Sequence, residues 1–385
     1  MKEPTLKELN IIIATHVFAT GPSQELEDYL KNKVKTLMFI GHPFSASKEQ
    51  QSFYKVYLNG ELRKERAGIA LRSPELLAYS KDFIYTLLWT INARKNFDIF
   101  FGVDPLNSFA GIFLNKIKRT RKVILYTIDY VPKRFSNNFV NQIYHQIDSY
   151  CVNNSHQIWN LSSRMAEERT KKNVLKDDRQ IVVPIGVNFD RIKRLPFKEI
   201  NRKWIAYMGH LRKGQGLELI IETLPRVVKE IPDVKLLIIG TGELENSLKK
   251  RVAELGISKN VEFKGFIKDH KDVENMLTQC AVGLAIYEPS SDSITQYTDP
   301  SKPKQYMACG LPVIITAVPW VAEEIEKKHM GLVIKYNENA LAEAVIKLLK
   351  DDKLYTESRE NAINFASELN WDKIFDNALF KALKS

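Results

Sequence analysis

The stretch Tyr297-Thr-Asp-Pro-Ser-Lys-Pro-Lys-Gln-Tyr-Met-Ala-Cys-Gly-Leu-Pro-Val-Ile-Ile-Thr316 decides the fold of this chain. Asp299 or Ser301 can cap a helix, because their side-chain oxygens accept the free N–H groups of its first turn. Gly310 can adopt a positive φ and end that helix, and Pro312 prevents a restart before a short apolar strand. Lys302 and Lys304 lie in the first turn, and exposed N–H groups, the helix dipole and a lysine together suit an anion such as a phosphate. The stretch therefore predicts an anion-binding helix start beside a parallel sheet.

A second phosphate-binding pattern lies upstream, where a basic, glycine-rich loop joins a strand to a helix. The strand covers residues 204–208, the loop is Gly209-His-Leu-Arg-Lys-Gly-Gln-Gly216, and the helix that follows has apolar residues at i, i+3, i+4 and i+7. Backbone N–H groups of such a loop suit a diphosphate. Gly240 and Gly242 follow the next strand. Glu245 stands where a dinucleotide fingerprint needs its third glycine, so we reject an NAD site.

The stretch from Tyr297 to Thr316, called the organising stretch from here on, resembles a known family. Residues 300–314, Pro-Ser-Lys-Pro-Lys-Gln-Tyr-Met-Ala-Cys-Gly-Leu-Pro-Val-Ile, are similar to the signature of the retaining glycosyltransferases of family four, which have the GT-B fold. The family's two glutamates fall on Tyr297 and Gln305 in this chain. The arginine and lysine of the family's basic loop fall on His210 and Gln215, with Arg212 and Lys213 one or two residues out of register.

An α/β fold follows from the alternation of strands and helices, which predicts parallel sheets in both halves. The resemblance adds a GT-B arrangement of two Rossmann-like domains that face a cleft. We expect an N-terminal, acceptor-side domain at residues 1–190, a linker at 189–201, and a C-terminal domain at 200–369 that binds the nucleotide-sugar. The final helix, residues 370–385, is expected to cross back to the N-terminal domain, with Trp371 as a packing anchor.

The resemblance also implies a donor site. Lys302 and Arg212 are expected to stabilise the departing diphosphate, and Asp129 to orient an acceptor or sugar hydroxyl, which makes these three the candidate catalytic residues. The candidate donor-binding residues are Gly21, Arg134, Gly209, Lys213, Gly214, Gly240, Gly242, Phe266, Ile267, Tyr287, Asp299, Ser301 and Gln305. We expect no metal and no cofactor beyond the donor, a UDP- or GDP-sugar. The expected acceptor is a glycan, such as a cell-envelope polysaccharide, or a lipid-linked molecule.

Two loops in the first half follow strand ends, where open α/β sheets present ligands. Gly21 opens a loop before a helix that Ser23 can cap, and a tight turn without a ligand is the alternative. Asp129 and Arg134 lie in a loop after a strand at residues 122–127, where Arg134 is expected to meet a phosphate. For Asp129, capping of a helix is the alternative to a role in the site.

The net charge of the chain is concentrated in one half. Residues 1–200 hold 31 Lys and Arg against 20 Asp and Glu, and residues 201–385 hold 26 of each, so the whole excess of +11 lies in the first half. An anionic membrane surface, a phosphorylated acceptor and a nucleic acid are each consistent with this excess, and so is ordinary solvated lysine. A basic, aromatic hairpin predicted at Asn59-Gly60 is the sole support for nucleic acid, so we expect none to bind.

Composition sets further bounds. The length of 385 residues and the hydrophobic content of 44% predict two or three packed domains. No run reaches the roughly 18 apolar residues of a bilayer span, the start does not resemble a signal peptide, and the three cysteines lack metal-ligand spacing. We expect a cytoplasmic protein, with attachment to the inner face of the cell membrane as one use of its basic half. A long helix started by Ser73 has an apolar stripe, including Ile84 and Leu88, that we expect to be core, with a membrane-facing surface as the alternative.

The leading prediction is thus a retaining glycosyltransferase that uses a nucleoside-diphosphate sugar. One alternative is a sugar-nucleotide epimerase of GT-B architecture, which would turn over the donor alone. The other is a catalytically weak binding or partner subunit, which the departures at His210, Gln215, Tyr297 and Gln305 favour.

Overall fold

The computed structural model describes residues 5–17, 21–44, 51–69, 75–130, 133–135, 137–173, 178–289 and 294–384. The chain divides into two compact units. The first unit comprises residues 1–184 and 371–385, and the second comprises residues 185–370. The predicted linker, residues 189–201, therefore lies inside the second unit, and the chain passes between the units at residues 184–185 and again at residues 370–371.

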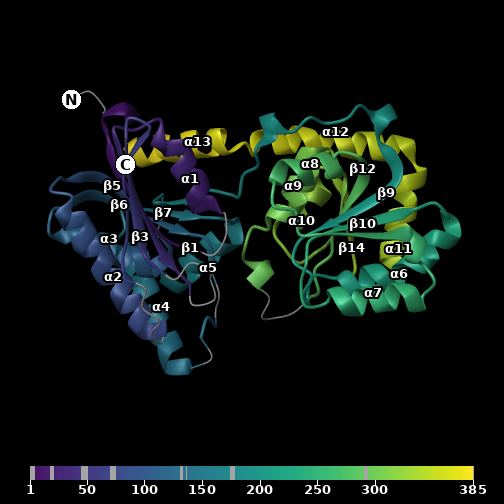
Figure 1. Ribbon diagram of the computed structural model, residues 1–385, viewed down its shortest axis with the longest axis horizontal. Helices are drawn as coiled ribbons and strands as arrows, with labels where there is room; N and C mark the ends of the chain where they lie inside the picture. Colours follow the sequence, from purple (N-terminus) through teal and green to yellow (C-terminus); the bar gives the residue numbers. More distant parts are fainter. Residues whose placement is uncertain are drawn as a thin grey trace. The chain divides into compact units, whose positions relative to one another are not determined.

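The first unit is built on an eight-stranded sheet with the order β4-β3-β2-β1-β5-β6-β7-β8 (Figure 1). Its strands are β1 (Asn10–Val17), β2 (Thr36–Pro43), β3 (Phe53–Leu58), β4 (Glu61–Ala67), β5 (Phe97–Val103), β6 (Thr120–Thr127), β7 (Gln157–Asn160) and β8 (Gln180–Val182). All neighbours pair in parallel except β2 with β3 and β3 with β4. The antiparallel pair β3–β4 is the predicted hairpin, and its turn residues Asn59 and Gly60 both have positive φ.

Helices flank the sheet of the first unit. They are α1 (Pro22–Lys31), α2 (Glu75–Asn92), α3 (Asp104–Lys116), α4 (Asn138–Asn154), α5 (Ser163–Asn173) and α13 (Trp371–Lys384). In Figure 1, α2, α3 and α4 form one layer, whereas α13 lies against α1. Tyr29 of α1 packs on Phe375 of α13, and Trp371 stacks on Phe375 at a centroid distance of 5.1 Å. The return of the final helix to the first unit is thus confirmed.

The second unit has a six-stranded, all-parallel sheet with the order β11-β10-β9-β12-β13-β14. The strands are β9 (Asn201–Met208), β10 (Lys235–Ile239), β11 (Val261–Gly265), β12 (Cys280–Ala285), β13 (Val313–Thr316) and β14 (Gly331–Ile334). The helices are α6 (Leu217–Glu230), α7 (Glu245–Glu254), α8 (His270–Leu277), α9 (Ser301–Cys309), α10 (Val321–Lys327), α11 (Glu338–Lys350) and α12 (Asp352–Glu368). Figure 1 shows α6, α7 and α11 on one side of this sheet, and α8, α9 and α12 on the other.

Each sheet is held by its own apolar core. The strands of the second unit read as nearly continuous apolar runs, as in Leu236 to Ile239, because helices cover both faces of the sheet. A separate cluster, which includes Ile12, Phe100 and Val123, fills one side of the first sheet. Two Rossmann-like, parallel-sheet units are therefore what the alternation of strands and helices predicted.

Two local predictions were wrong. Helix α1 begins at Pro22 with Gly21 as its N-cap, and Ser23 instead shares hydrogen bonds with Thr15 and Gln24. The apolar stripe of α2 is only partly core, since Ile84 is 53% exposed and Leu88 is 50% exposed. The predicted cap of α2 at Ser73 lies outside the described residues.

Candidate functional site

The organising stretch folds as predicted at its end but not at its start. Helix α9 begins at Ser301, and its N-cap is Pro300, which has no side chain that can accept a hydrogen bond. The expected cap by Asp299 or Ser301 is therefore absent, and no side chain in the described part of the chain caps the N–H groups of the first turn. Gly310 ends the helix in the left-handed conformation, at φ 84°. An uncapped helix start retains its capacity to bind an anion.

Lys302 is a buried cation in the first turn of α9. Its side chain is 7% exposed, and its Nζ lies 4.2 Å from the ring centroid of Tyr207 and 3.1 Å from the Oε1 atom of Gln215, to which it donates. Among the described residues, no carboxylate forms an ion pair with it. Burial, and secondarily the positive charge of Arg212, lower the pKa of Lys302 to about 7. The site can therefore stabilise the negative charge of a ligand, because no described carboxylate neutralises Lys302.

Tyr287 adds an unsatisfied group beside Lys302. It follows strand β12, it is 3% exposed, and its ring centroid lies 5.2 Å from the Nζ atom of Lys302. Its hydroxyl is buried and has no hydrogen-bond partner among the described residues. Its backbone is fixed, because the N–H donates to Thr316 Oγ1 at 2.8 Å and the carbonyl accepts from the same hydroxyl at 2.7 Å. A buried phenol normally has a partner, so its position also indicates a ligand.

The glycine-rich loop between β9 and α6 closes around Lys302. Gly209 has a φ of 141°, and a Cβ atom there would lie 3.2 Å from the Cε atom of Lys302. Gly216, at φ 69°, is the N-cap of α6. Gly214 also has positive φ, with open space where a side chain would be. The loop therefore needs glycine, and it leaves its backbone accessible to a ligand.

The two basic residues of this loop are exposed. Neither Arg212 nor Lys213 forms an ion pair with any described residue, and the charge of Arg212 acts on Lys302. Gly240 and Gly242 have a different part. A Cβ atom at Gly240 would collide with the carbonyl oxygen of Gly209, and one at Gly242 with that of Leu211. Because neither glycine has a side chain, the backbone of the β10–α7 loop can pack directly against the backbone of the basic loop.

Asp299 and Lys304 form a buried structural pair. Asp299 is 1% exposed, its Oδ2 atom accepts the N–H of Ile185 at 2.6 Å, and its Oδ1 atom accepts the indole N–H of Trp320 at 3.0 Å. Lys304 is fully buried, makes an ion pair with Asp299 and donates to the carbonyl of Ile185 at 2.8 Å. Both Asp299 oxygens are thus engaged by the protein, so the expected contact of Asp299 with the donor does not follow from this geometry.

The remaining candidates of the second unit lie around the same edge of the sheet. Gln305 donates to Glu274 Oε1 at 3.1 Å, and Glu274 is paired with Arg191. Ser301 is exposed at the helix start, and Ile267 is half-buried. Phe266 follows Gly265, whose φ is 67°, and is 75% exposed. A large apolar side chain exposed at the carboxyl edge of a parallel sheet is suited to contact a planar ligand.

In the first unit, Asp129 and Arg134 share an edge of the sheet with a carboxylate that the sequence analysis missed. Asp104 follows β5 directly, has a strained φ of 66°, and accepts the N–H of Ile128 at 3.1 Å through Oδ1. Burial, and then the charge of Asp129, raise the pKa of Asp104 to about 6, while Arg134 opposes the rise. Loss of hydration also raises the pKa of Asp129, and the charge of Arg134 opposes this rise. Arg134 is therefore balanced by two carboxylates.

The backbone N–H group at the N-cap of α1 has a hydrogen-bond partner within the same helix. The N–H of Gly21 donates to Oε1 of Gln24 at 3.0 Å, and the φ of Gly21 is −163°, which is extended backbone. This position does not require glycine for its conformation.

A buried cluster of two histidines and one aspartate at the ends of β1 and β2 was also missed. His16 Nε2 and His42 Nδ1 each lie 3.4 Å from an oxygen of Asp82, and His42 Nε2 is 2.8 Å from the hydroxyl of Thr86. Burial lowers the pKa of His42, whereas Asp82 opposes that shift. The signal in the sequence was a histidine near the end of each of two strands. Within the described ranges, no group of three or more His, Cys, Asp or Glu side chains could hold a metal ion.

Comparison with known proteins places this site in context. Residues 188–365 match the family described as glycosyl transferases, group 1. Spore coat protein SA of Bacillus subtilis is 29% identical over 192 residues, which are 46% of this chain and 48% of that protein. Alpha-monoglucosyldiacylglycerol synthase of Streptococcus pneumoniae is 25% identical over 229 residues, 52% of this chain and 49% of that protein. The chain thus spans about half the length of these curated relatives.

The fold is shared over a longer range. The crystal structure of Anabaena HepE in complex with UDP-glucose superposes with a TM-score of 0.69 at 14% identity, covering 98% of this chain and 100% of that one. The resemblance seen in the organising stretch is therefore confirmed. Residues 188–365, which carry Lys302 and both phosphate-binding patterns, thus match the group 1 glycosyl transferases, and the whole chain shares the two-domain fold of HepE.

Proposed function

We propose that this protein is a retaining glycosyltransferase that moves a sugar from a nucleoside-diphosphate sugar to a glycan or lipid-linked acceptor. One observation carries the proposal. Lys302 is a buried ammonium group that no carboxylate of the described residues pairs with, and it is enclosed by a glycine-rich loop at an uncapped helix start. Because a buried charge without a counter-charge destabilises a protein, its retention indicates a function that needs it. A diphosphate supplies the missing charge.

The relatives support the choice of donor and of reaction. HepE was crystallised with UDP-glucose, which makes a UDP-sugar the first donor to test here. The names of several relatives describe glycosyl transfer, and alpha-monoglucosyldiacylglycerol synthase makes a glycolipid. A lipid-linked acceptor is therefore included in the proposal. Nucleoside identity would depend on the loop at Gly265 and Phe266, whose backbone and ring lie at the sheet edge.

In the proposed reaction, the bond between the sugar and the diphosphate breaks, the oxygen of the acceptor hydroxyl forms a bond to the same sugar carbon, and the hydroxyl proton is released with the diphosphate. Negative charge develops on the diphosphate as it departs. Lys302, the N–H groups of α9 and the exposed Arg212 and Lys213 would stabilise that charge. The hydroxyl of Tyr287 would be a further donor to the same oxygens, because it is buried beside Lys302 and no described residue bonds to it.

We assign the acceptor to the first unit. Asp129 is exposed at the carboxyl end of β6, and Asp104 stands at the carboxyl end of β5, so both lie where a parallel sheet presents ligands. Carboxylates there would orient an acceptor hydroxyl. Asp104, with a pKa of about 6, would be ionised in most molecules at neutral pH.

The test is thermal melting with UDP, GDP, ADP and CDP in large excess. At about 100 times its dissociation constant a ligand adds roughly 2.7 kcal/mol of stability, which gives a clear melting shift. We expect one nucleotide to stand out, and we expect Lys302→Met to weaken its binding about ten- to a hundredfold, the value of a hydrogen bond to a charged group. Lys250→Met, on the exposed face of α7, is the matched control. If none of the four nucleotides shifts the melting temperature, the donor site is lost and the proposal fails.

A second candidate is a partner subunit that binds the nucleotide-sugar without transferring the sugar. It is favoured by Gln305, whose amide is occupied by Glu274 rather than directed to a ligand. This protein would show the same nucleotide shift but would release no UDP from UDP-glucose in the presence of acceptors. Release of UDP together with a glycosylated product would exclude a non-catalytic partner subunit. Release of UDP without an acceptor would indicate hydrolysis of the donor.

A further inference from the structure

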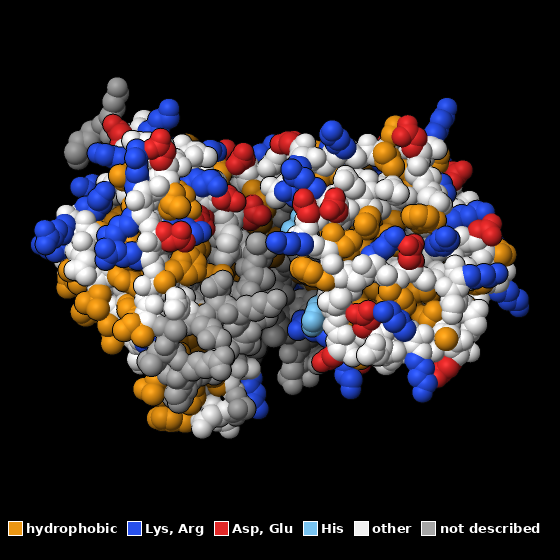
Figure 2. Space-filling model, viewed as in Figure 1, with side chains coloured by type: hydrophobic (Ala, Val, Ile, Leu, Met, Phe, Trp, Pro, Cys, Tyr) orange, Lys and Arg blue, Asp and Glu red, His pale blue; other side chains and the backbone are white. Residues whose placement is uncertain are grey.

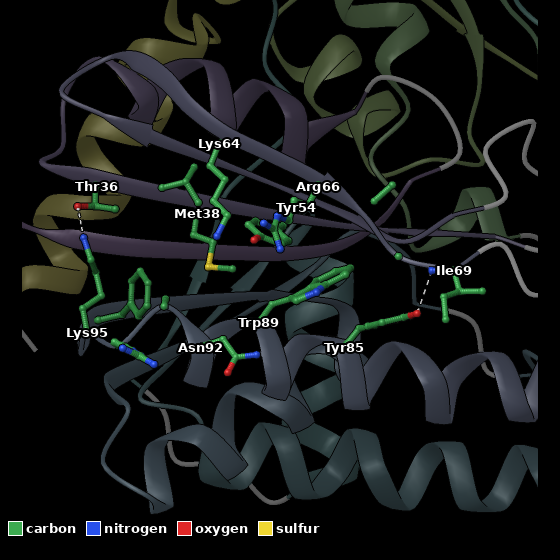
Figure 3. Close-up of a pocket in the computed structure, with 16 residues that line it drawn as sticks. Thr36, Met38, Tyr54, Lys64, Arg66, Ile69, Tyr85, Trp89, Asn92 and Lys95 are labelled. Atoms are coloured by element: carbon green, nitrogen blue, oxygen red, sulfur yellow. Dashed lines mark hydrogen bonds between the residues drawn. The ribbon is translucent and has the colours of Figure 1, made fainter.

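The first unit contains a pocket of about 850 Å³ that none of the predicted site residues lines. Figure 3 shows it between the sheet, which contributes Met38, Tyr54, Lys64 and Arg66, and the second half of α2, which contributes Tyr85 and Trp89. Its lining comes from β2, β3 and β4 on the sheet side, and from α2 and the segment that follows it on the other. Its volume is in the range of ligand sites.

The base of the pocket is aromatic. Tyr85 stacks on Trp89 with ring centroids 4.7 Å apart, and Tyr54 lies 5.1 Å from Trp89. The hydroxyl of Tyr85 accepts the N–H of Ile69 at 3.0 Å, which fixes the strand end against the helix. These rings form an apolar surface that an acyl or other apolar group can contact.

All charged residues that line the pocket are cations: Lys64, Arg66, Arg94 and Lys95. None of the four forms an ion pair with a described residue. Lys64 lies over the ring of Tyr54 at 5.5 Å, and Lys95 donates to the hydroxyl of Thr36 at 3.2 Å. Four cations without a carboxylate around an apolar floor are complementary to a molecule with an anionic group on an apolar body.

The pocket is separate from the edge that presents ligands in the first unit. Thr36 is the first residue of β2, and Lys95 precedes the first residue of β5, so this end of the pocket lies at the amino ends of those strands. Asp104 and Asp129, in contrast, follow the carboxyl ends of β5 and β6. The pocket therefore does not belong to the proposed acceptor site.

An exposed apolar surface adjoins the pocket on α2. Ile84 and Leu88 are each one residue before Tyr85 and Trp89, which places them about 100° further around the helix. With Leu77, which is 61% exposed, they form a stripe next to the pocket.

The exposed apolar surface continues on α3. Phe83 of α2 packs on Phe109 and Phe113 of α3, and Phe113 and Ile117 are 45% and 44% exposed. Figure 2 shows hydrophobic side chains gathered over the helices labelled α2 and α3 in Figure 1. An apolar surface beside a cationic pocket fits the interface of a lipid bilayer, where acyl chains and charged headgroups lie next to each other.

We propose that this pocket binds the headgroup of an anionic phospholipid, and that the apolar stripe of α2 and α3 rests in the interface of the bilayer that supplies it. The excess charge of the first 200 residues acts in the same direction. None of the described helices is long and apolar enough to cross a membrane. This inference concerns attachment and is independent of the proposed donor chemistry.

The test is flotation of the full chain with two kinds of vesicle, one of phosphatidylcholine alone and one that also contains phosphatidylglycerol. We expect binding to the anionic vesicles only. The double variant Lys64→Gln/Arg66→Gln should reduce that binding about thirtyfold, the effect of two surface cations. The control Lys229→Gln/Lys250→Gln removes the same charge from exposed positions of the second unit and should keep the binding. The variant Ile84→Ser/Leu88→Ser should also bind less, at every salt concentration.

Three results would overturn the proposal. Equal binding to both kinds of vesicle would show that the cations do not select a headgroup. An equal loss in the pocket variant and in its control would indicate net charge rather than a site. Equal competition by soluble glycerol phosphate would assign the pocket to a free phosphate compound. Circular-dichroism melting of each variant verifies that it folds, and the nucleotide melting shift in the pocket variant separates a failure of attachment from a failure of the donor site.

Discussion

Lys302 shows how a single residue can cost stability in order to serve a ligand. Among the described residues, its amine donates to the side-chain oxygen of Gln215 and lies over the rings of Tyr207 and Tyr287, and none of these groups carries a full negative charge. Charged groups in such surroundings usually pair or lose their proton. The lowered pKa of Lys302, about 7, is the direct expression of that cost.

We predict that Lys302→Met stabilises the unliganded protein. The folded-state pKa of about 7 lies below the ordinary value of 10.5, so the destabilisation is fully present below pH 7 and fades as the pH rises toward 10.5. The gain in the free energy of unfolding should be roughly 2–4 kcal/mol at pH 6 and close to zero at pH 10. Urea unfolding at both pH values measures it. A gain of the same size at both would show that the methionine acts by packing and not by charge.

At this scale, the sequence identified residues within a motif but not the partners that bind them. Lys302 and the basic loop could be predicted, because the residues that build a helix start and a glycine-rich loop are close in sequence. The engagement of Asp299 by Ile185 and Trp320 could not, since Ile185 is 114 positions away and nothing local indicates the contact. Asp104 was missed for the same reason, as its charge partners Asp129 and Arg134 come from another strand end.

Among the elements, α9 is attached to the first residue of the second unit by a buried ion pair. Asp299 and Lys304 bracket the start of the helix and both bond to the backbone of Ile185, through its N–H and its carbonyl. This pair fixes where the helix begins. It therefore also fixes the position of Lys302, which lies between Asp299 and Lys304 in the sequence. The pair thus influences the site only by positioning the helix, because its own polar atoms bond to the protein.

We predict that Asp299→Asn destabilises the second unit by about 3–5 kcal/mol, because it leaves Lys304 buried without its counter-charge. The double variant Asp299→Asn/Lys304→Met should recover a large part of the loss, since both charges are then gone. Chemical unfolding of the wild type, both single variants and the double variant forms a complete cycle. If the two single effects add, Asp299 and Lys304 are not coupled and the attachment has another origin.

Elements were predicted well where one local rule determined them. The Asn59-Gly60 turn specified the β3–β4 hairpin, and Gly310 specified the end of α9, because both positions need positive φ. Helix starts were predicted less well, since Ser23 and Ser301 can cap a helix but other residues occupied the N-cap. The exposed stripe of α2 was taken for core because helical spacing indicates that apolar residues share a face, but not what covers that face.

On the scale of the whole molecule, two cores imply two unfolding events. The first unit has its own eight-stranded sheet and the second its own six-stranded sheet, each with buried apolar clusters. The donor candidates lie in the second unit except for Gly21 and Arg134. A ligand of the donor site should therefore act mainly on one of the two events.

We predict two transitions in scanning calorimetry, which a nucleotide and a core variant separate. Saturating UDP should raise the transition of the second unit alone. Phe375→Ala, which removes a fully buried ring of α13, should lower the transition of the first unit alone, at a cost of about 3–5 kcal/mol. A single transition that moves with both changes would mean that the units unfold together.

The position of α13 also affects the order in which the molecule is made. Residues 371–384 complete the first unit, but the ribosome adds them only after the whole of residues 185–370. At about 5–20 residues per second, the nascent first unit stays unfinished for roughly ten to forty seconds while a contiguous second unit emerges and folds. During this interval the side of α1 that carries Tyr29 is exposed to solvent and to other chains. Of the two units, the one whose translation begins first is thus the last to be completed.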